Sequence, residues 1–261
     1  MHSRSEILAS FERFLDILDE LREKCPWDRK QTNDSLRPNT IEEVYELSDA
    51  LVANDTLNIC KELGDVLLHV AFYAKIAQEK ELFDIKDVCD RLCEKLIYRH
   101  PHVFGEAKAE TAGDVCRSWE QIKRTEKDGN KRVLSGVPVS MPSLIKAFRM
   151  QEKAANIGFD WDKKEDVWVK VQEEIKELQT EMDCGNKKDM EKEFGDLLFS
   201  LVNAARLYGI NPDNALELTN AKFRRRFTYV EEAALEQNRD LRNLSLEEMD
   251  ELWNRAKAEG L

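Results

Sequence analysis

The chain carries one acidic pattern twice. The motifs are Glu43-x-x-Glu46 and Glu62-x-x-Asp65 in the first half, and Glu174-x-x-Glu177 and Glu193-x-x-Asp196 in the second. In each half, 19 residues separate the first acids of the two motifs. Because positions i and i+3 lie about 60° apart on an α-helix, each motif places both acids on one helix face. The pattern predicts, in each half, two long helices that face each other across four carboxylates.

Four carboxylates between two helices repel one another, and removing each from water costs on the order of several kcal/mol. A divalent cation among them removes most of that penalty. Ligation by carboxylates selects hard ions, and Mg²⁺ keeps positions for water and for substrate phosphates. We therefore expect Mg²⁺, with Mn²⁺ as a substitute, bound together with a phosphate-bearing substrate.

Composition favours an all-α fold. The 261 residues include only 10 Gly and 6 Pro, 35% of them are charged, and helical periodicity runs through long segments. The repeat favours two tandem domains, and breaker residues between them suggest a linker. We expect an N-terminal domain over residues 1–128, a linker over 129–142 and a C-terminal domain over 143–261.

Helix boundaries follow from periodicity and capping residues. In the second half, Asp162-x-x-Glu165 is interpreted as an N-cap whose helix ends near Asp183, before Cys184-Gly185-Asn186. A further helix is expected after Ser245, the cap of Ser245-x-x-Glu248. The remaining expected helices are Ser5–Lys24, Ile41–Ala53, Leu57–Glu79, Ile85–Arg99, a shorter one at Val115–Arg124, Lys187–Tyr208 and Asn214–Gln237.

Charge and cysteine usage exclude several classes of protein. The formal net charge of −12 disfavours non-specific nucleic-acid binding, which depends on Lys and Arg. Six cysteines without a C-x-x-C pair suggest reduced thiols in a cytoplasm. No apolar leader is evident in residues 1–18, and the longest apolar stretch, Val66–Ala77, is too short to span a bilayer. We expect a cytoplasmic protein without a membrane partner.

Several stretches together resemble the MazG-type nucleoside triphosphate pyrophosphohydrolases. They are Cys25-Pro-Trp-Asp28 with Gln31-Thr32, Glu42-Glu43-x-x-Glu46, Glu62-Leu-Gly-Asp65, Arg99-His-Pro-His-Val-Phe104, Trp119-Glu-Gln-Ile-Lys123, Gly158-Phe-Asp-Trp161 and Lys222-Phe-x-x-Arg226. The resemblance implies tandem all-α MazG domains, helix hairpins that form bundles across a homodimer, and Mg²⁺-dependent hydrolysis of NTPs or dNTPs to the monophosphate and pyrophosphate. It also implies that the C-terminal half carries the activity, with the N-terminal half weak or structural.

By the same resemblance, roles pass to individual residues. The metal ligands would be Glu174, Glu177, Glu193 and Asp196, with Glu43, Glu46, Glu62 and Asp65 as a second, vestigial set. Nucleotide contacts would fall on Lys170, Lys222, Arg226, Trp253 and one lysine ahead of Glu193, Lys187 or Lys188, of which we assign Lys188. The catalytic carboxylates would be Glu174 and Glu173, the latter positioning the attacking water or accepting its proton.

For several of these residues, a role in the fold alone is an alternative to a role in function. Glu43 could belong to the capping box Thr40-x-x-Glu43 at the start of a helix. No capping role explains Glu174, which is expected well inside its helix. This difference favours the second half as the catalytic one. Lys222 and Arg226 could be solvated surface charges, and Trp253 could anchor the core of the last helix. A non-catalytic nucleotide-binding module, regulatory or scaffolding, is the alternative function. Base and sugar preference do not follow from this sequence.

Overall fold

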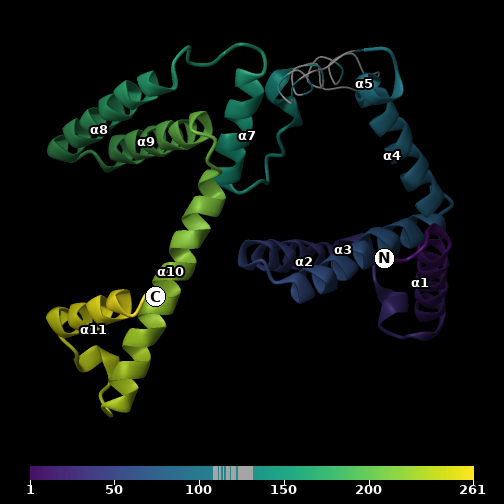
Figure 1. Ribbon diagram of the computed structural model, residues 1–261, viewed down its shortest axis with the longest axis horizontal. Coiled ribbons are helices and arrows are strands. Elements are labelled where there is room, and N and C mark those ends of the chain that lie inside the picture. Colours follow the sequence, from purple (N-terminus) through teal and green to yellow (C-terminus); the bar gives the residue numbers. More distant parts are fainter. Residues whose placement is uncertain (108–110, 112, 114, 116–117, 119–121, 123–131) are drawn as a thin grey trace. The chain divides into compact units, whose positions relative to one another are not determined.

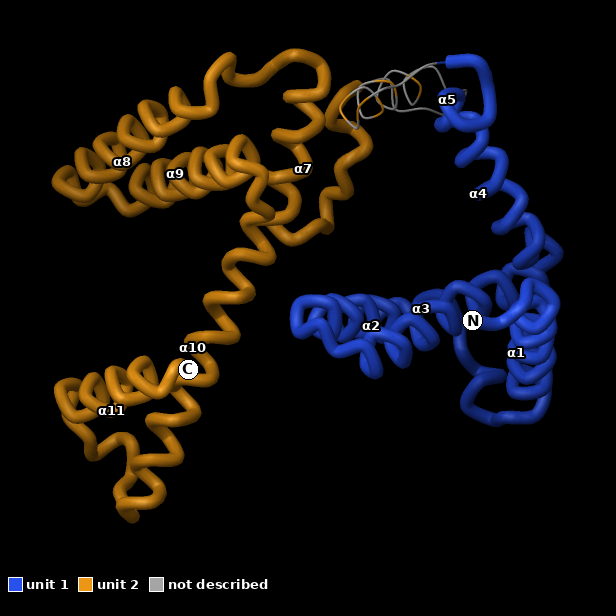
Figure 2. The backbone as a smooth tube through the Cα atoms, in the orientation of Figure 1, with its two compact units in different colours: residues 1–108 blue, residues 109–261 orange. Residues whose placement is uncertain are grey.

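The computed structural model describes residues 1–107, 111, 113, 115, 118, 122 and 132–261. Every regular element in those ranges is a helix, which confirms the predicted all-α fold. The chain divides into two compact units, Met1–Lys108 and Ala109–Leu261 (Figures 1 and 2). The domain limits 1–128 and 143–261 stay a prediction. Within the predicted linker, Val133–Gly136 forms a 3₁₀ turn.

The first unit is built around a helix hairpin. Its helices are α1 (Arg4–Lys24), α2 (Asn33–Ala53), α3 (Thr56–Gln78), α4 (Ile85–Arg99) and α5 (Pro101–Phe104), with a 3₁₀ turn at Asp28–Lys30. Helix α2 runs along α3, and α1 and α4 also pack on α3 (Figure 1). The buried core joins Leu18 of α1, Leu36 of α2 and Phe72 of α3. This packing leaves the α2–α3 hairpin projecting from the core.

The second unit repeats the hairpin and adds a long helix. Its helices are α7 (Ser143–Ala155), α8 (Val167–Cys184), α9 (Lys187–Leu207), α10 (Pro212–Glu236) and α11 (Leu246–Ala258), with 3₁₀ turns at Lys164–Asp166 and Leu241–Asn243. Helices α8 and α9 pack along each other, and α7 packs on α9. Val167, Val171 and Ala204 form the buried contact between α8 and α9. Helix α11 packs on α10 around Val230 and Leu252.

The two hairpin turns have the same local structure. Asn54 ends α2 and Gly185 ends α8, both in the left-handed conformation, with φ of 54° and 73°. Asn and Gly are the residues that adopt this conformation at least cost. The next residues, Asp55 and Asn186, cap α3 and α9 with side-chain oxygens. Residues with the same conformational and capping preferences therefore produce the same turn in each half, 131 residues apart.

Two predicted helix starts are wrong. Helix α2 begins at Asn33 rather than Ile41, because Thr32 and Ser35 cap it reciprocally and Pro38 lies inside the helix. Helix α8 begins at Val167, after the 3₁₀ turn Lys164–Asp166, so Asp162 does not cap it.

The other helix predictions with described residues agree with the structure to within two residues at each end. The predicted helix Val115–Arg124 lies mostly outside the described residues. In the described ranges, no helix is both long enough and apolar enough to cross a bilayer.

Candidate metal and nucleotide site

Three of the predicted acids of the second unit converge between α8 and α9. Glu174 and Glu177 lie one turn apart on α8, and Glu193 projects from α9. Their carboxylate oxygens lie within 4.8 Å of one another. Glu174 is buried, Glu193 is half-buried and Glu177 is exposed. The trio therefore forms a site that is closed on one side and open to solvent on the other.

The electrostatics of this trio fit a cation. Burial raises the pKa of Glu193, and the charges of Glu177, Asp196 and Glu174 raise it further. Asp196, the fourth predicted ligand, is exposed and lies outside the converging trio, one turn further along α9. Because negative charge is concentrated at oxygens with ligand spacing, these carboxylates could hold a divalent cation.

Lys170 compensates part of this negative charge. Its ammonium group lies 2.7 Å from Glu174 Oε1 and donates to Glu173 Oε1 at 2.9 Å. The hydrogen bond to Glu174, and then that to Glu173, raises the pKa of Lys170 well above its usual value. Glu174 is only 5% exposed, so an unpaired charge there would be costly. Glu173 lies on the exposed side of the same helix turn.

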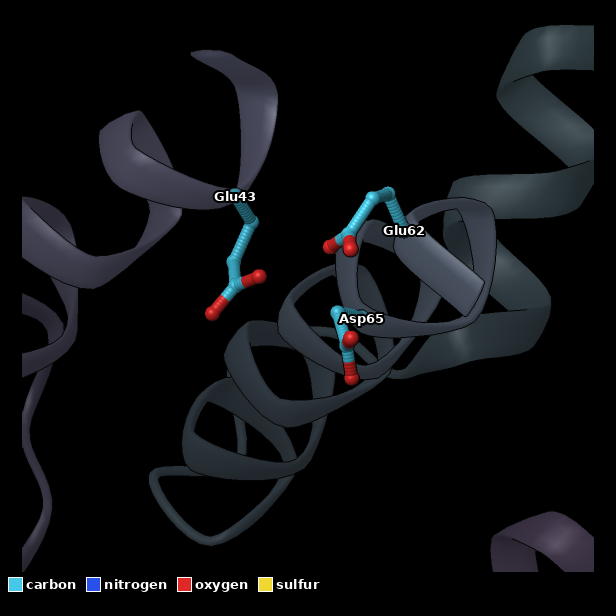
Figure 3. Close-up of side chains that lie close together, drawn as sticks. All are labelled: Glu43, Glu62 and Asp65. Carbon is cyan, nitrogen blue, oxygen red and sulfur yellow. The ribbon is translucent and has the colours of Figure 1, made fainter. Parts of the chain in front are cut away.

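The first unit contains a matching trio of Glu43, Glu62 and Asp65. Figure 3 shows Glu43 extending from α2 and Glu62 pointing toward it from α3, with Asp65 one turn along. Burial raises the pKa of Glu43, followed by the charges of Asp65, Glu46 and Glu62. Glu46 itself is exposed and outside the trio. Four acids thus influence one another in each half, although the third member of the converging trio differs.

Glu62 is the most buried acid of the first trio. It is 4% exposed, and Lys61 donates to its Oε1 at 2.8 Å. Among the described residues, its Oε2 has no hydrogen-bond partner. A buried carboxylate oxygen without a partner is costly, and a cation beside Glu62 would remove that cost. The first trio therefore also fits a cation.

The capping interpretation of Glu43 is wrong. Thr40 lies inside α2, where its hydroxyl donates to the Leu36 carbonyl at 3.0 Å and lies 3.0 Å from His69 Nδ1. Glu43 therefore sits well inside its helix, as Glu174 does, and capping does not distinguish the two halves. The two halves differ in the side chains that pack between the two helices of each hairpin. The buried polar contacts of Thr40, His69 and Tyr73 in the first unit correspond, 131 residues on, to Val171, Ser200 and Ala204.

The predicted nucleotide-binding residues of α10 and α11 lie together, but not with the acidic trio. The guanidinium of Arg226 lies 5.6 Å from the Trp253 ring centre, and its Nε donates to the Leu261 carbonyl at 2.6 Å. Trp253 also packs on Phe223, at 5.1 Å between ring centres. In Figure 1, α11 lies beside the C-terminal part of α10, away from α8 and α9. Lys222 is exposed on α10.

Lys188 is the remaining predicted nucleotide-binding residue. Lys188 is exposed in the first turn of α9, and its backbone N–H donates to Asn186.

A cavity of about 510 Å³ lies between α7, the loop that follows it and α9. The sequence did not indicate this cavity, although the motif Gly158-Phe-Asp-Trp161 forms the loop that lines it. The other lining residues come from positions far apart in the chain, which no local pattern connects.

Comparison with known proteins agrees with this geometry. The sequence model of the MazG nucleotide pyrophosphohydrolase domain matches residues 31–104 and 163–230, which contain the two acidic hairpins. The chain belongs to the MazG family. It is 44% identical over 250 residues to the "Nucleoside triphosphate pyrophosphohydrolase/pyrophosphatase MazG" of Thermotoga maritima, covering 95% of each chain. It is 40% identical over 257 residues to the "Nucleoside triphosphate pyrophosphohydrolase" of Escherichia coli K12, covering 96% of this chain and 98% of the relative.

A third relative is longer than this chain. The "Uncharacterized protein YabN" of Bacillus subtilis is 47% identical over 251 residues, which cover 95% of this chain and 51% of that protein. The similarity to all three relatives therefore runs through both acidic hairpins.

Proposed function

We propose that this MazG-family chain hydrolyses nucleoside triphosphates, NTP or dNTP, to the monophosphate and pyrophosphate with Mg²⁺. The observation that carries the proposal is the convergence of Glu174, Glu177 and Glu193 in a hairpin that the MazG domain covers. The names of the relatives from Thermotoga maritima and Escherichia coli support the same reaction.

The metal would be held by the carboxylates of the second unit. Glu174, Glu177 and Glu193 offer oxygens at ligand spacing. Asp196, one turn beyond Glu193 on α9, would be the fourth donor. All-oxygen ligation suits Mg²⁺, and Mn²⁺ as a substitute. When bound, the metal neutralises phosphate charge and lowers the pKa of a water molecule.

The chain's own residues then bind phosphate and move a proton. Lys170 bridges Glu173 and Glu174, so a cation beside Glu174 would free its ammonium group for a phosphate oxygen. Glu173, released from Lys170, would face solvent with a free carboxylate. Because one ammonium group contacts both Glu173 and Glu174, Glu173 lies near Glu174 and would orient the attacking water and accept its proton. Lys188, at the start of α9, would bind a further phosphate oxygen.

A homodimer would complete this site. Phe194, Leu198 and Leu201 follow one another at positions i, i+4 and i+7 of α9, and they are 54%, 49% and 41% exposed. Exposed apolar stripes of this kind mark protein interfaces. Within one chain, Lys222, Arg226 and Trp253 lie away from the acidic trio. A second copy packed on this stripe would offer its own three residues to the phosphates and the base.

The first unit is proposed as a weak or structural copy. Two positions distinguish it from the second unit at the 131-residue offset. Asn39 stands where Lys170 pairs with the acids, so the first trio lacks that ammonium group. Phe72 stands where the second unit has Asn203, and it is 3% exposed within the core. Cation binding without turnover is the expected behaviour there.

We also propose a cytoplasmic protein that acts without nucleic acid or membrane. The net charge of −12 opposes binding to a polyanion. The five cysteines within the described residues are free thiols. House-cleaning of aberrant nucleotides and control of a signalling nucleotide are both compatible with the site.

Product analysis tests the reaction. The full-length protein is incubated with ATP or dCTP and Mg²⁺, and the products are separated by anion-exchange chromatography. Monophosphate with pyrophosphate is expected. Diphosphate with phosphate would refute the reaction, and nucleotide binding without turnover would favour a regulatory or scaffolding module. A panel of canonical, deoxy and oxidised triphosphates then separates house-cleaning from control of one nucleotide.

A further inference from the structure

A cavity in the first unit lies between the start of α2 and the end of α3. Both helices line it, together with the loop that joins α3 to α4. Its volume of about 390 Å³ falls in the range of roughly 300–1,000 Å³ that ligand pockets occupy. The cavity is therefore large enough for one small molecule.

Much of the cavity wall is apolar. Ile76 and Ala77 line it from α3, where both are buried. Leu82 and Phe83 line it from the loop after α3, and they are 69% and 41% exposed. Large apolar side chains that stay exposed at a cavity gain from contact with an apolar or aromatic ring. The wall therefore favours a ligand with such a ring.

Two cationic side chains lie at the same cavity. Arg37 of α2 and Lys80, just beyond the end of α3, both line it and are exposed. Within the described part of the chain, neither forms a salt bridge, whereas Lys75 on α3 pairs with Asp19 at 2.8 Å. Asp34 also lines the cavity, so its charged lining residues are two cations and one acid. An anionic group would find there the planar fork of an arginine and the ammonium group of a lysine.

The second unit fills the corresponding place with its own side chains. At the 131-residue offset, Trp168 stands for Arg37 and Tyr208 for Ala77. Trp168 Nε1 donates to the Tyr208 hydroxyl at 3.2 Å, and the two ring centres lie 6.2 Å apart. The first unit thus has a cation and a small residue where the second has two aromatic rings in contact. The repeated hairpin therefore carries this cavity as a feature of the first unit.

The cavity is separate from the acidic trio of the same hairpin. Arg37 precedes Glu43 by six residues on α2, which is about 9 Å along the helix axis. Ala77 follows Asp65 by twelve residues on α3, which is about 18 Å. A molecule in the cavity would therefore not be a phosphate held by a metal ion at the carboxylates.

We propose that this cavity binds a small amphipathic anion, a molecule with one apolar or aromatic ring and a phosphate or carboxylate group. Arg37 and Lys80 bind the anionic group, and Ile76, Leu82 and Phe83 contact the ring. The inference is independent of the proposed hydrolysis, because it needs neither the metal ligands nor the second unit.

Methyl NMR of the full-length protein without metal tests this site. The isoleucine δ1-methyl groups are labelled with ¹³C, and the Ile76 signal is assigned with the Ile76→Val variant. Phenyl phosphate and phenylacetate, which carry the two kinds of anionic group on the same ring, are titrated separately. At least one of them should shift the Ile76 signal to saturation and leave that of Ile175, on the second hairpin, unchanged. The probe that binds more tightly identifies the anionic group.

Two further probes separate the contributions of ring and charge. Inorganic phosphate lacks the ring and benzyl alcohol lacks the charge, so each should bind about tenfold more weakly than the tighter ring anion.

Substitutions at exposed positions test the two cations. Arg37→Gln and Lys80→Gln should each weaken binding of the ring anion about tenfold, because each removes a charge-assisted hydrogen bond. Arg37→Trp places in the first unit the side chain that the second unit has, and it should abolish binding. Arg91→Gln, an equal change of charge on α4 away from the cavity, is the matched control and should bind as the wild type does.

Three outcomes would overturn the inference. An Ile76 signal that neither ring anion shifts would refute the site. Equal binding of inorganic phosphate and phenyl phosphate would indicate attraction to surface charge alone. An Ile76 signal that responds to protein concentration and not to the probes would mean that a second copy fills the cavity.

Discussion

Replacing Glu177 by Gln should remove most of the activity without unfolding the protein. Glu177 is exposed at the open side of the trio, so the change removes a charge but no buried contact. Surface substitutions of this kind usually alter stability by no more than about 0.5 kcal/mol. The expected defect is therefore in metal binding and turnover, and not in the fold.

The magnitude follows from the geometry of the trio. Its oxygens lie within 4.8 Å of one another, so a cation between them would lie within about 4 Å of each. Two unit charges at 4 Å interact by about 4 kcal/mol at an effective dielectric constant of 20. The amide oxygen of the substituted side chain would keep part of this attraction. A loss of about 2–4 kcal/mol corresponds to a fall of about 30-fold to 1,000-fold in kcat/KM at limiting Mg²⁺.

Glu46→Gln is the matched control, because Glu46 is the exposed counterpart of Glu177 in the first unit. Pyrophosphate release is measured for both variants over a series of Mg²⁺ concentrations, with thermal melting recorded in parallel. Glu46→Gln should keep most of the activity, and both melting temperatures should stay within about 2 °C of the wild type. Loss of activity in a folded Glu46→Gln variant, with Glu177→Gln active, would refute the assignment of the catalytic half.

Three further predictions concern phosphate binding, assembly and pH. Arg226→Lys keeps the charge but loses the planar fork, so kcat/KM should fall about tenfold, with only a small fall in melting temperature from the lost contacts with Trp253 and Leu261. Equal activity would leave Arg226 with a structural role alone. Leu198→Glu should convert a dimer to a monomer in sedimentation, and a monomeric wild type would contradict the proposed interface. The hydrogen bond from Arg22 lowers the pKa of Glu79, so it stabilises the fold above the unfolded pKa near 4.5. Glu79→Gln should therefore lower the melting temperature by about 2–4 °C at pH 7 and progressively less as pH falls below 4, whereas a constant difference would contradict this linkage.

The acidic hairpins could be predicted from sequence because the signals that build them are local. Helical periodicity placed Glu174 and Glu177 on one face, and Gly185 with Asn186 marked the turn between α8 and α9. Such features depend on hydrogen bonds within a few residues, which the residue types themselves select. Where two local signals competed, the prediction was wrong. Thr40-x-x-Glu43 has the form of a capping box, yet Thr32 and Ser35 cap α2 a full two turns earlier.

Tertiary packing decided which side chains meet across helices. The contact of Val167 and Val171 with Ala204 sets how α8 lies on α9, and so brings Glu193 to Glu174 while Asp196 stays exposed. It is also packing that joins Gln151 to the Phe199 carbonyl, 48 residues away, and leaves a cavity and a buried acceptor between them. Residue spacing along one helix determines a face, but the angle and depth at which two faces meet depend on the volumes of all the side chains between them. The acids could therefore be predicted from the amino-acid sequence, and the cavity between α7 and α9 could not.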